Sequence, residues 1–121
     1  MLDSRRLHDE SGLAESRTGS HYVLRVEGPV DVRGAVVLGR RLLAALNAGE
    51  RRLLLDLSAA APLASGALMG TLLRIDRYAS RREARLVVLS GPPTRRMLEL
   101  GNPQRLVTVA TTPAEADALL A

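Results

Sequence analysis

The chain carries few side chains that could perform catalysis. Its two histidines, His8 and His21, do not belong to a set spaced like metal ligands. Cysteine is absent, which excludes disulfide bonds, thiol catalysis and thiolate metal sites. The acidic residues are scattered rather than paired for general acid–base catalysis, and glycine-rich phosphate loops and nucleophile elbows are missing. We therefore expect a protein that is not an enzyme and that holds neither a cofactor nor a metal ion.

Three polar residues stand where predicted helices and strands begin or end. Asp31 precedes a helical pattern and Ser65 opens another, so each side chain can cap its helix by accepting a backbone hydrogen bond. Asp56 follows an apolar run, and we expect it to end that strand by accepting hydrogen bonds from nearby backbone amides. We assign Asp56 no functional role, because the acidic pair and the lysine of a receiver-type phosphorelay domain are absent.

The net charge of +4 raises the question of nucleic-acid binding. All 17 basic residues are arginines, and they are dispersed along the chain with acidic residues among them. Proteins bind single-stranded nucleic acid through aromatic platforms, and the only aromatic residues here are Tyr22 and Tyr78. We interpret the arginine pairs as solvated helix faces and do not predict nucleic-acid binding.

With 121 residues, the chain has the length of one domain with its own core. No apolar run approaches the length of a membrane span, and residues 1–20 lack the apolar stretch of a secretory signal. We therefore expect a cytoplasmic protein that does not bind membranes. Residues 1–12 form a polar N-terminal segment, and the single domain covers residues 13–121.

The periodicity of apolar residues predicts the elements that position these side chains. Alternation in steps of two indicates strands, recurrence every three or four residues indicates helices, and short continuous apolar runs indicate strands covered on both faces. Strands are predicted over 13–17, 21–27, 53–57, 84–90 and 106–109, and helices over 32–48, 65–82, 92–101 and 112–121. The order ββαβαβαβα indicates a single α/β domain with a mixed sheet of about five strands and four helices.

Five short segments stand in a distinctive order at the ends of these elements. They are Gly28–Asp31, Leu54–Ser58, Leu63–Leu68, Ser90–Pro92 and Leu100–Gly101. Together they resemble the STAS domain, the fold of bacterial anti-sigma factor antagonists, over residues 13–121. The resemblance implies the STAS-like fold and a role as a protein–protein interaction domain in bacterial signalling.

In that family the helix-opening motif reads Asp-Ser-Ser/Thr-Gly, and a cognate kinase phosphorylates the serine after the aspartate. The unphosphorylated antagonist captures the kinase, and phosphate at the interface releases it. Aligning Ser65-Gly66 with the end of the motif puts Leu63 at the aspartate and Ala64 at the phospho-acceptor. Because alanine cannot accept a phosphate, we expect the usual switch to be missing. Ser65 is the remaining candidate phospho-acceptor, and helix capping is its alternative role.

The resemblance also implies where a partner binds. Asp31 matches an aspartate that lies close to the acceptor loop in the family, although it can equally cap the first helix. The expected partner-binding residues are Gly28, Pro29, Asp31, Pro62, Leu63, Ala64, Ser65, Gly66, Ala67, Leu68 and Met69. The expected partner is an anti-sigma factor or a serine kinase-like protein. The alternative is a scaffold or assembly subunit that pairs with other STAS proteins or with itself. A small-molecule carrier is not expected, because no cluster of converging polar groups is evident.

Overall fold

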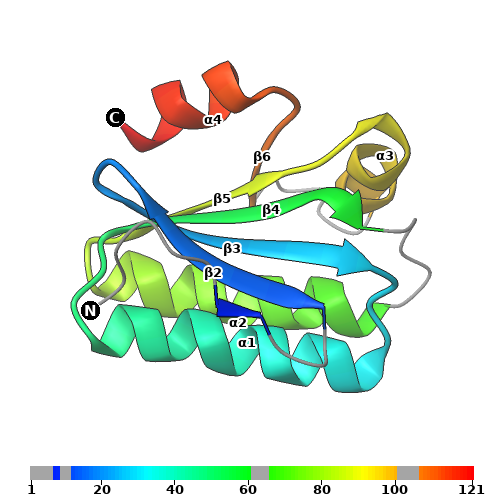
Figure 1. The fold of residues 1–121 in the computed structure, drawn as a ribbon, viewed down its shortest axis with the longest axis horizontal. Coiled ribbons are helices and arrows are strands. Elements are labelled where there is room, and N and C mark those ends of the chain that lie inside the picture. The colour runs from blue at the N-terminus through cyan, green and yellow to red at the C-terminus, as the bar shows by residue number, and fades with distance from the viewer. Residues whose placement is uncertain (1–6, 9–11, 61–65, 101–106) are drawn as a thin grey trace.

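The computed structural model describes residues 7–8, 12–60, 66–100 and 107–121. Within these ranges the helices are α1 (Val32–Asn47), α2 (Gly66–Arg81), α3 (Pro92–Leu100) and α4 (Pro113–Leu120). The strands there are β1 (Leu7–His8), β2 (Leu13–Thr18), β3 (His21–Gly28), β4 (Arg52–Ala60), β5 (Arg85–Leu89) and β6 (Thr108–Ala110). From β2 onward the order is ββαβαβαβα, which confirms the predicted fold class (Figure 1).

The strands of the described residues form one mixed sheet in the order β1-β2-β3-β4-β5-β6. The first three strands are antiparallel, whereas β3 to β6 run parallel because a helix crosses over between each pair. The sequence does not predict β1, a two-residue strand in the polar N-terminal segment that pairs with β2. Its residues show no alternation long enough to indicate a strand, so only the pairing reveals it.

Two helices cover one face of the sheet, and α4 lies on the other (Figure 1). Tyr22, Leu24 and Val26 alternate along β3 and are buried in one core cluster with leucines of α1 and α2. A second, smaller cluster joins Val87 and Leu89 of β5 to apolar residues of α4. The strand β5 is therefore buried on both faces, as its continuous apolar run predicts.

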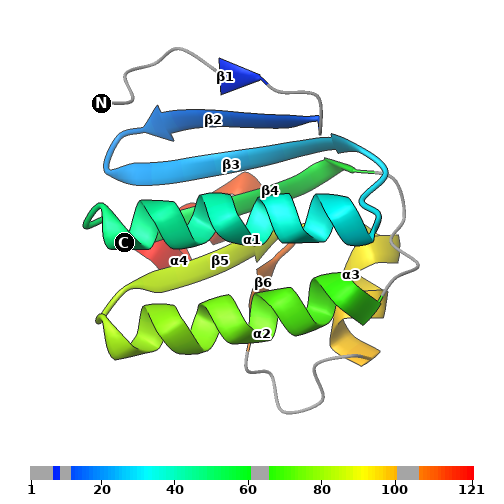
Figure 2. The same cartoon turned by 90° about the horizontal axis from the view of Figure 1, so that it is seen from below.

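The helices α1 and α2 pack side by side and run in the same direction (Figure 2). Leu38, Leu42 and Leu46 form the buried stripe of α1 that their spacing predicts. A Cβ added at Gly39 would stand 2.9 Å from Thr71 Cγ2, so a glycine permits the close approach of the two helices. No helix in the described ranges combines the length and apolar character needed to cross a bilayer.

Two strands differ from the prediction by more than one residue at an end. The strand β4 continues to Ala60, because the pairs Glu27↔Ala59 and Gly28↔Ala60 extend its ladder with β3 beyond the apolar run. One extra residue in β4 shifts the register there, as a β-bulge does. The last strand is Thr108–Ala110 rather than 106–109, and Leu106 lies outside the described residues.

Candidate functional site

The turn after β3, the last residues of β4 and the start of α2 lie at one end of the sheet. The strands β3 and β4 are parallel, so Gly28 at the end of one pairs with Ala60 at the end of the other. The helices α1 and α2 both begin at this end (Figure 2). We call this surface the helix entrance and define it as residues 28–32, 36, 58–60 and 66–69.

Asp31 caps α1. Its side-chain Oδ1 accepts a hydrogen bond from the Gly34 N–H at 2.7 Å, and its backbone is extended, as expected of an N-cap residue. The capping role left open by the sequence is thereby confirmed. The carboxylate remains exposed, so it is also accessible to a partner.

Gly28 has a structural reason for being glycine. Its φ is +82°, a left-handed conformation that side chains with a Cβ rarely adopt. This backbone turn directs the chain from β3 into the cap at Asp31. We therefore attribute the residue type of Gly28 to the turn rather than to direct contact with a partner.

Apolar side chains are exposed at the helix entrance. Val32 and Val36 are 64% and 47% exposed, and they lie one turn apart on α1. Pro29, in the preceding turn, is exposed as well. Isolated exposed valines are ordinary, but three neighbouring apolar side chains at the end of a sheet form a surface suited to protein contact.

The start of α2 agrees with the prediction in position and differs in one side chain. The helix begins at Gly66, directly after the segment that follows β4, and Ala67 and Met69 are half-buried. Leu68, expected on the binding surface, is 1% exposed and belongs to the core. The 3.6-residue period explains this correction, because Leu68 and Leu72 share the inward stripe of the helix. Pro62, Leu63, Ala64 and Ser65 lie outside the described residues, and so does the predicted cap at Ser65.

Asp56 lies inside β4, which corrects the prediction that it ends the strand. Its Oδ1 accepts hydrogen bonds from the backbone N–H and the hydroxyl of Ser58, at 2.9 and 2.5 Å. The predicted bonding to a nearby backbone amide is thus confirmed. Its Oδ2 lies 3.6 Å from Nη1 of Arg25, the residue that pairs with Asp56 across the β3–β4 ladder.

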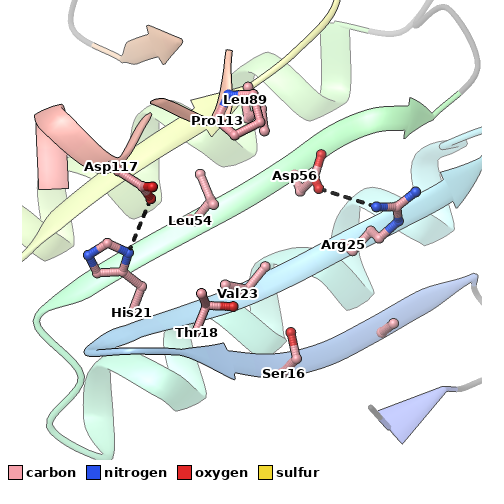
Figure 3. A pocket seen from close by; sticks show the side chains of 11 residues that line it. Ser16, Thr18, His21, Val23, Arg25, Leu54, Asp56, Leu89, Pro113 and Asp117 are labelled. Carbon is pink, nitrogen blue, oxygen red and sulfur yellow. Dashed lines mark ion pairs between the residues drawn. The ribbon is translucent and has the colours of Figure 1, made fainter. Parts of the chain in front are cut away.

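Arg25 and Asp56 line a groove on the sheet face opposite α1 and α2 (Figure 3). The groove has a volume of about 270 Å³ and lies between the β2–β3 hairpin and α4. Val23 and Leu54 contribute apolar side chains to it, and Ser16 and Thr18 contribute hydroxyls. It exists because α4 covers the β5 side of this face and leaves the hairpin side open.

Two ion pairs stand in the groove, and both are too long for hydrogen bonds (Figure 3). His21 Nδ1 lies 3.8 Å from Asp117 Oδ1 of α4, and Arg25 forms the second pair with Asp56. The sequence did not indicate a polar cluster, and the structure corrects that expectation. No sequence motif could reveal it, because its members come from β2, β3, β4 and α4 and meet only in the folded chain.

Asp76 is a carboxyl on α2 whose pKa is raised by burial. It makes no ion pair with another described residue and lines a shallow hollow beside β5 and β6. A raised pKa means that the folded state binds the proton more tightly than the unfolded state. The stability contributed by this group therefore falls as the pH rises from the ordinary aspartate pKa through the raised value.

We expect Asp76→Asn to raise the free energy of unfolding at pH 7, because it removes a half-buried charge and keeps the shape of the side chain. The gain should shrink as the pH falls to about 4. Urea unfolding of both proteins at several pH values measures this difference. A gain that does not change with pH would show that burial of the charge is not its cause.

A mixed sheet with two crossover helices on one face, and with the turn after β3 beside the start of α2, is the arrangement expected of a STAS-type module. The family model described as "Mlab, STAS domain" matches residues 13–108. The chain therefore belongs to the STAS domain family, as its sequence segments suggested. A search of curated protein sequences finds no match.

Solved structures with the same fold include two anti-sigma factor antagonists and one protein proposed to be an antagonist. The proposed antagonist, from Thermotoga maritima, has a TM-score of 0.77 and 21% identity, and the match covers 89% of this chain and 93% of the Thermotoga chain. An antagonist from Mycobacterium paratuberculosis has a TM-score of 0.71 and 23% identity, and the match covers 89% of this chain and 92% of the antagonist. The anti-sigma factor antagonist SpoIIAA, in its unphosphorylated form, has a TM-score of 0.67 and 15% identity, and the match covers 88% of this chain and 94% of SpoIIAA. These similarities establish a shared fold.

Proposed function

We propose that this chain is a non-enzymatic protein-binding module that acts as an anti-sigma factor antagonist. Its partner is an anti-sigma factor or a serine kinase-like protein, bound at the helix entrance and the adjoining segment 61–65. The observation that carries the proposal is the exposed apolar surface at the helix entrance in a chain of the STAS family. The antagonists of similar fold named above support the same role.

The chemistry of the helix entrance suits contact with another protein. Pro29, Val32 and Val36 offer apolar area that a partner can remove from water at about 25 cal/mol per Å². The exposed Asp31 carboxylate stands beside them and supplies a charge that fixes the partner's orientation. The first turn of α2 carries no acidic residue, so it does not repel an acidic group of the partner.

We further propose that this partner is not released by phosphorylation at the usual position. Ala64 stands where the family resemblance puts the phospho-acceptor, and alanine has no hydroxyl. A phosphate would add up to two negative charges at the interface and would weaken binding. Without it, binding is governed by the amounts of the two proteins rather than by a kinase.

The test is to mix the purified chain with each anti-sigma factor or kinase-fold protein of its own organism and to measure masses by size exclusion with light scattering. We expect a heterocomplex with one such protein, and we expect the free chain to be a monomer. A chain that forms a stable homo-oligomer, or that binds only other STAS proteins, would contradict the proposal and support the alternative scaffold role.

A further inference from the structure

The outer surface of α1 and α2 carries five exposed arginines. They are Arg33 and Arg40 on α1 and Arg74, Arg77 and Arg81 on α2. The spacing of seven residues on α1, and of three and four on α2, puts each set on one stripe of its helix. The two helices lie side by side (Figure 2), so the two stripes form one surface. We call these five residues the arginine face.

Among the described residues, this surface holds no acidic side chain to balance the arginines. The helix α1 contains no aspartate or glutamate. The one acidic residue of α2, Asp76, is half-buried and lines the hollow beside β5 and β6. Seven residues of helix span about 10 Å, and packed helices are about 8–10 Å apart, so each charge stands within about a Debye length of its nearest neighbour on this surface.

Five of the other described arginines have acidic partners within the chain, whereas Arg52, Arg82, Arg85 and Arg96 form no ion pair with a described carboxylate. Arg41, adjacent to Arg40, forms an ion pair with Glu15 of β2. Arg17 pairs with Glu50, and Arg51 and Arg95 also have glutamate partners. No arginine of the arginine face forms an ion pair with a described carboxylate, and Arg74 Nη2 donates a long hydrogen bond to the Thr71 hydroxyl at 3.4 Å.

We infer that the arginine face is a docking surface for an acidic surface of another protein. The cluster of like charges destabilises the free chain, and carboxylates of a partner would offset that repulsion through paired hydrogen bonds to guanidinium groups. This inference goes beyond the proposed function, because it concerns the outer side of the two helices and holds whichever protein occupies the helix entrance.

Two other anionic partners fit the surface less well. Duplex DNA admits one helix into a major groove about 12 Å wide, whereas two packed helices present a layer about 20 Å across. A membrane would require a broad apolar face for insertion, but the apolar stripes of both helices are buried in the core, and only Val32 and Val36 among the large apolar side chains described on α1 and α2 are exposed. An acidic protein surface can contact the whole width of the two helices, because it needs neither a narrow groove nor apolar side chains for insertion.

The test measures binding of the full chain to three probes at several salt concentrations. The probes are a fluorescent glutamate-rich peptide, vesicles of phosphatidylcholine and phosphatidylserine, and a short DNA duplex. We expect the peptide to bind most tightly, with an affinity that falls as salt rises. Tighter binding of the vesicles or the duplex, or no peptide binding at low salt, would overturn the inference.

The double variant Arg40→Glu/Arg77→Glu should weaken peptide binding at least about tenfold. The control is Arg52→Glu/Arg96→Glu, which changes net charge equally at exposed positions outside the arginine face. We expect the control to change affinity by less than about twofold, and circular dichroism should show that both variants remain folded. Equal losses in the two variants would show that net charge alone attracts the peptide and would overturn the inference.

Discussion

Replacing Ala64 by glutamate is expected to weaken partner binding by at least about 100-fold. If position 64 is buried in the complex, the glutamate carboxylate loses its hydration without gaining a counter-charge. Burying an unpaired charge in this way costs about 3 kcal/mol or more, and 1.4 kcal/mol corresponds to a tenfold change in affinity. Titration calorimetry with the partner found by light scattering measures the dissociation constant.

The matched control is Ala64→Ser, which adds one hydroxyl and no charge. Without a kinase, this variant should bind within about threefold of the unmodified chain, because a small hydroxyl at an interface is tolerated. With an active kinase and ATP, the new serine should restore release of the partner. If Ala64→Glu binds as tightly as the unmodified chain, position 64 is not in the interface.

Replacing Glu15 by alanine is expected to lower the free energy of unfolding by about 3 kcal/mol. The Glu15 carboxylate joins three elements, because it accepts a hydrogen bond from the Tyr22 hydroxyl at 2.6 Å and forms an ion pair with Arg41 of α1. Tyr22 is buried, and this burial together with the bond to Glu15 raises its pKa above the ordinary value. Loss of the carboxylate leaves a buried hydroxyl without its acceptor.

Urea unfolding followed by circular dichroism measures this loss, and Glu27→Ala is the control. Glu27 is also a glutamate of the β2–β3 hairpin, but its side chain is exposed and its contact with Arg25 is a surface ion pair. We expect the control to change stability by less than about 0.5 kcal/mol. Similar losses of unfolding free energy in the two variants would contradict the structural role of Glu15.

The parts of the fold that follow from local periodicity could be predicted from the sequence. The spacing of Leu38, Leu42 and Leu46 predicts the buried stripe of α1, and the alternation of Tyr22, Leu24 and Val26 predicts the inner face of β3. These patterns depend only on how a helix or a strand presents its side chains to a core. The position of the helix entrance follows from the same elements, because strand and helix ends determine it.

Features that depend on contacts between distant segments could not be predicted. Arg40 and Arg41 are adjacent in sequence, but Arg41 turns toward Glu15 whereas Arg40 is exposed on the outer stripe of α1. The groove with Arg25, Asp56 and Asp117 also forms only when β3, β4 and α4 meet. The extension of β4 past Asp56 depends on pairing with β3 rather than on apolar character.

The most direct test of the proposed function is the dissociation constant of the unmodified chain and its kinase-fold partner, measured before and after incubation with ATP. Mass spectrometry of the same samples shows whether Ser65 carries a phosphate. We predict an unchanged dissociation constant and an unmodified Ser65, because the usual acceptor position holds alanine. Release of the partner on addition of ATP, with a phosphorylated peptide that contains Ser65, would contradict the account.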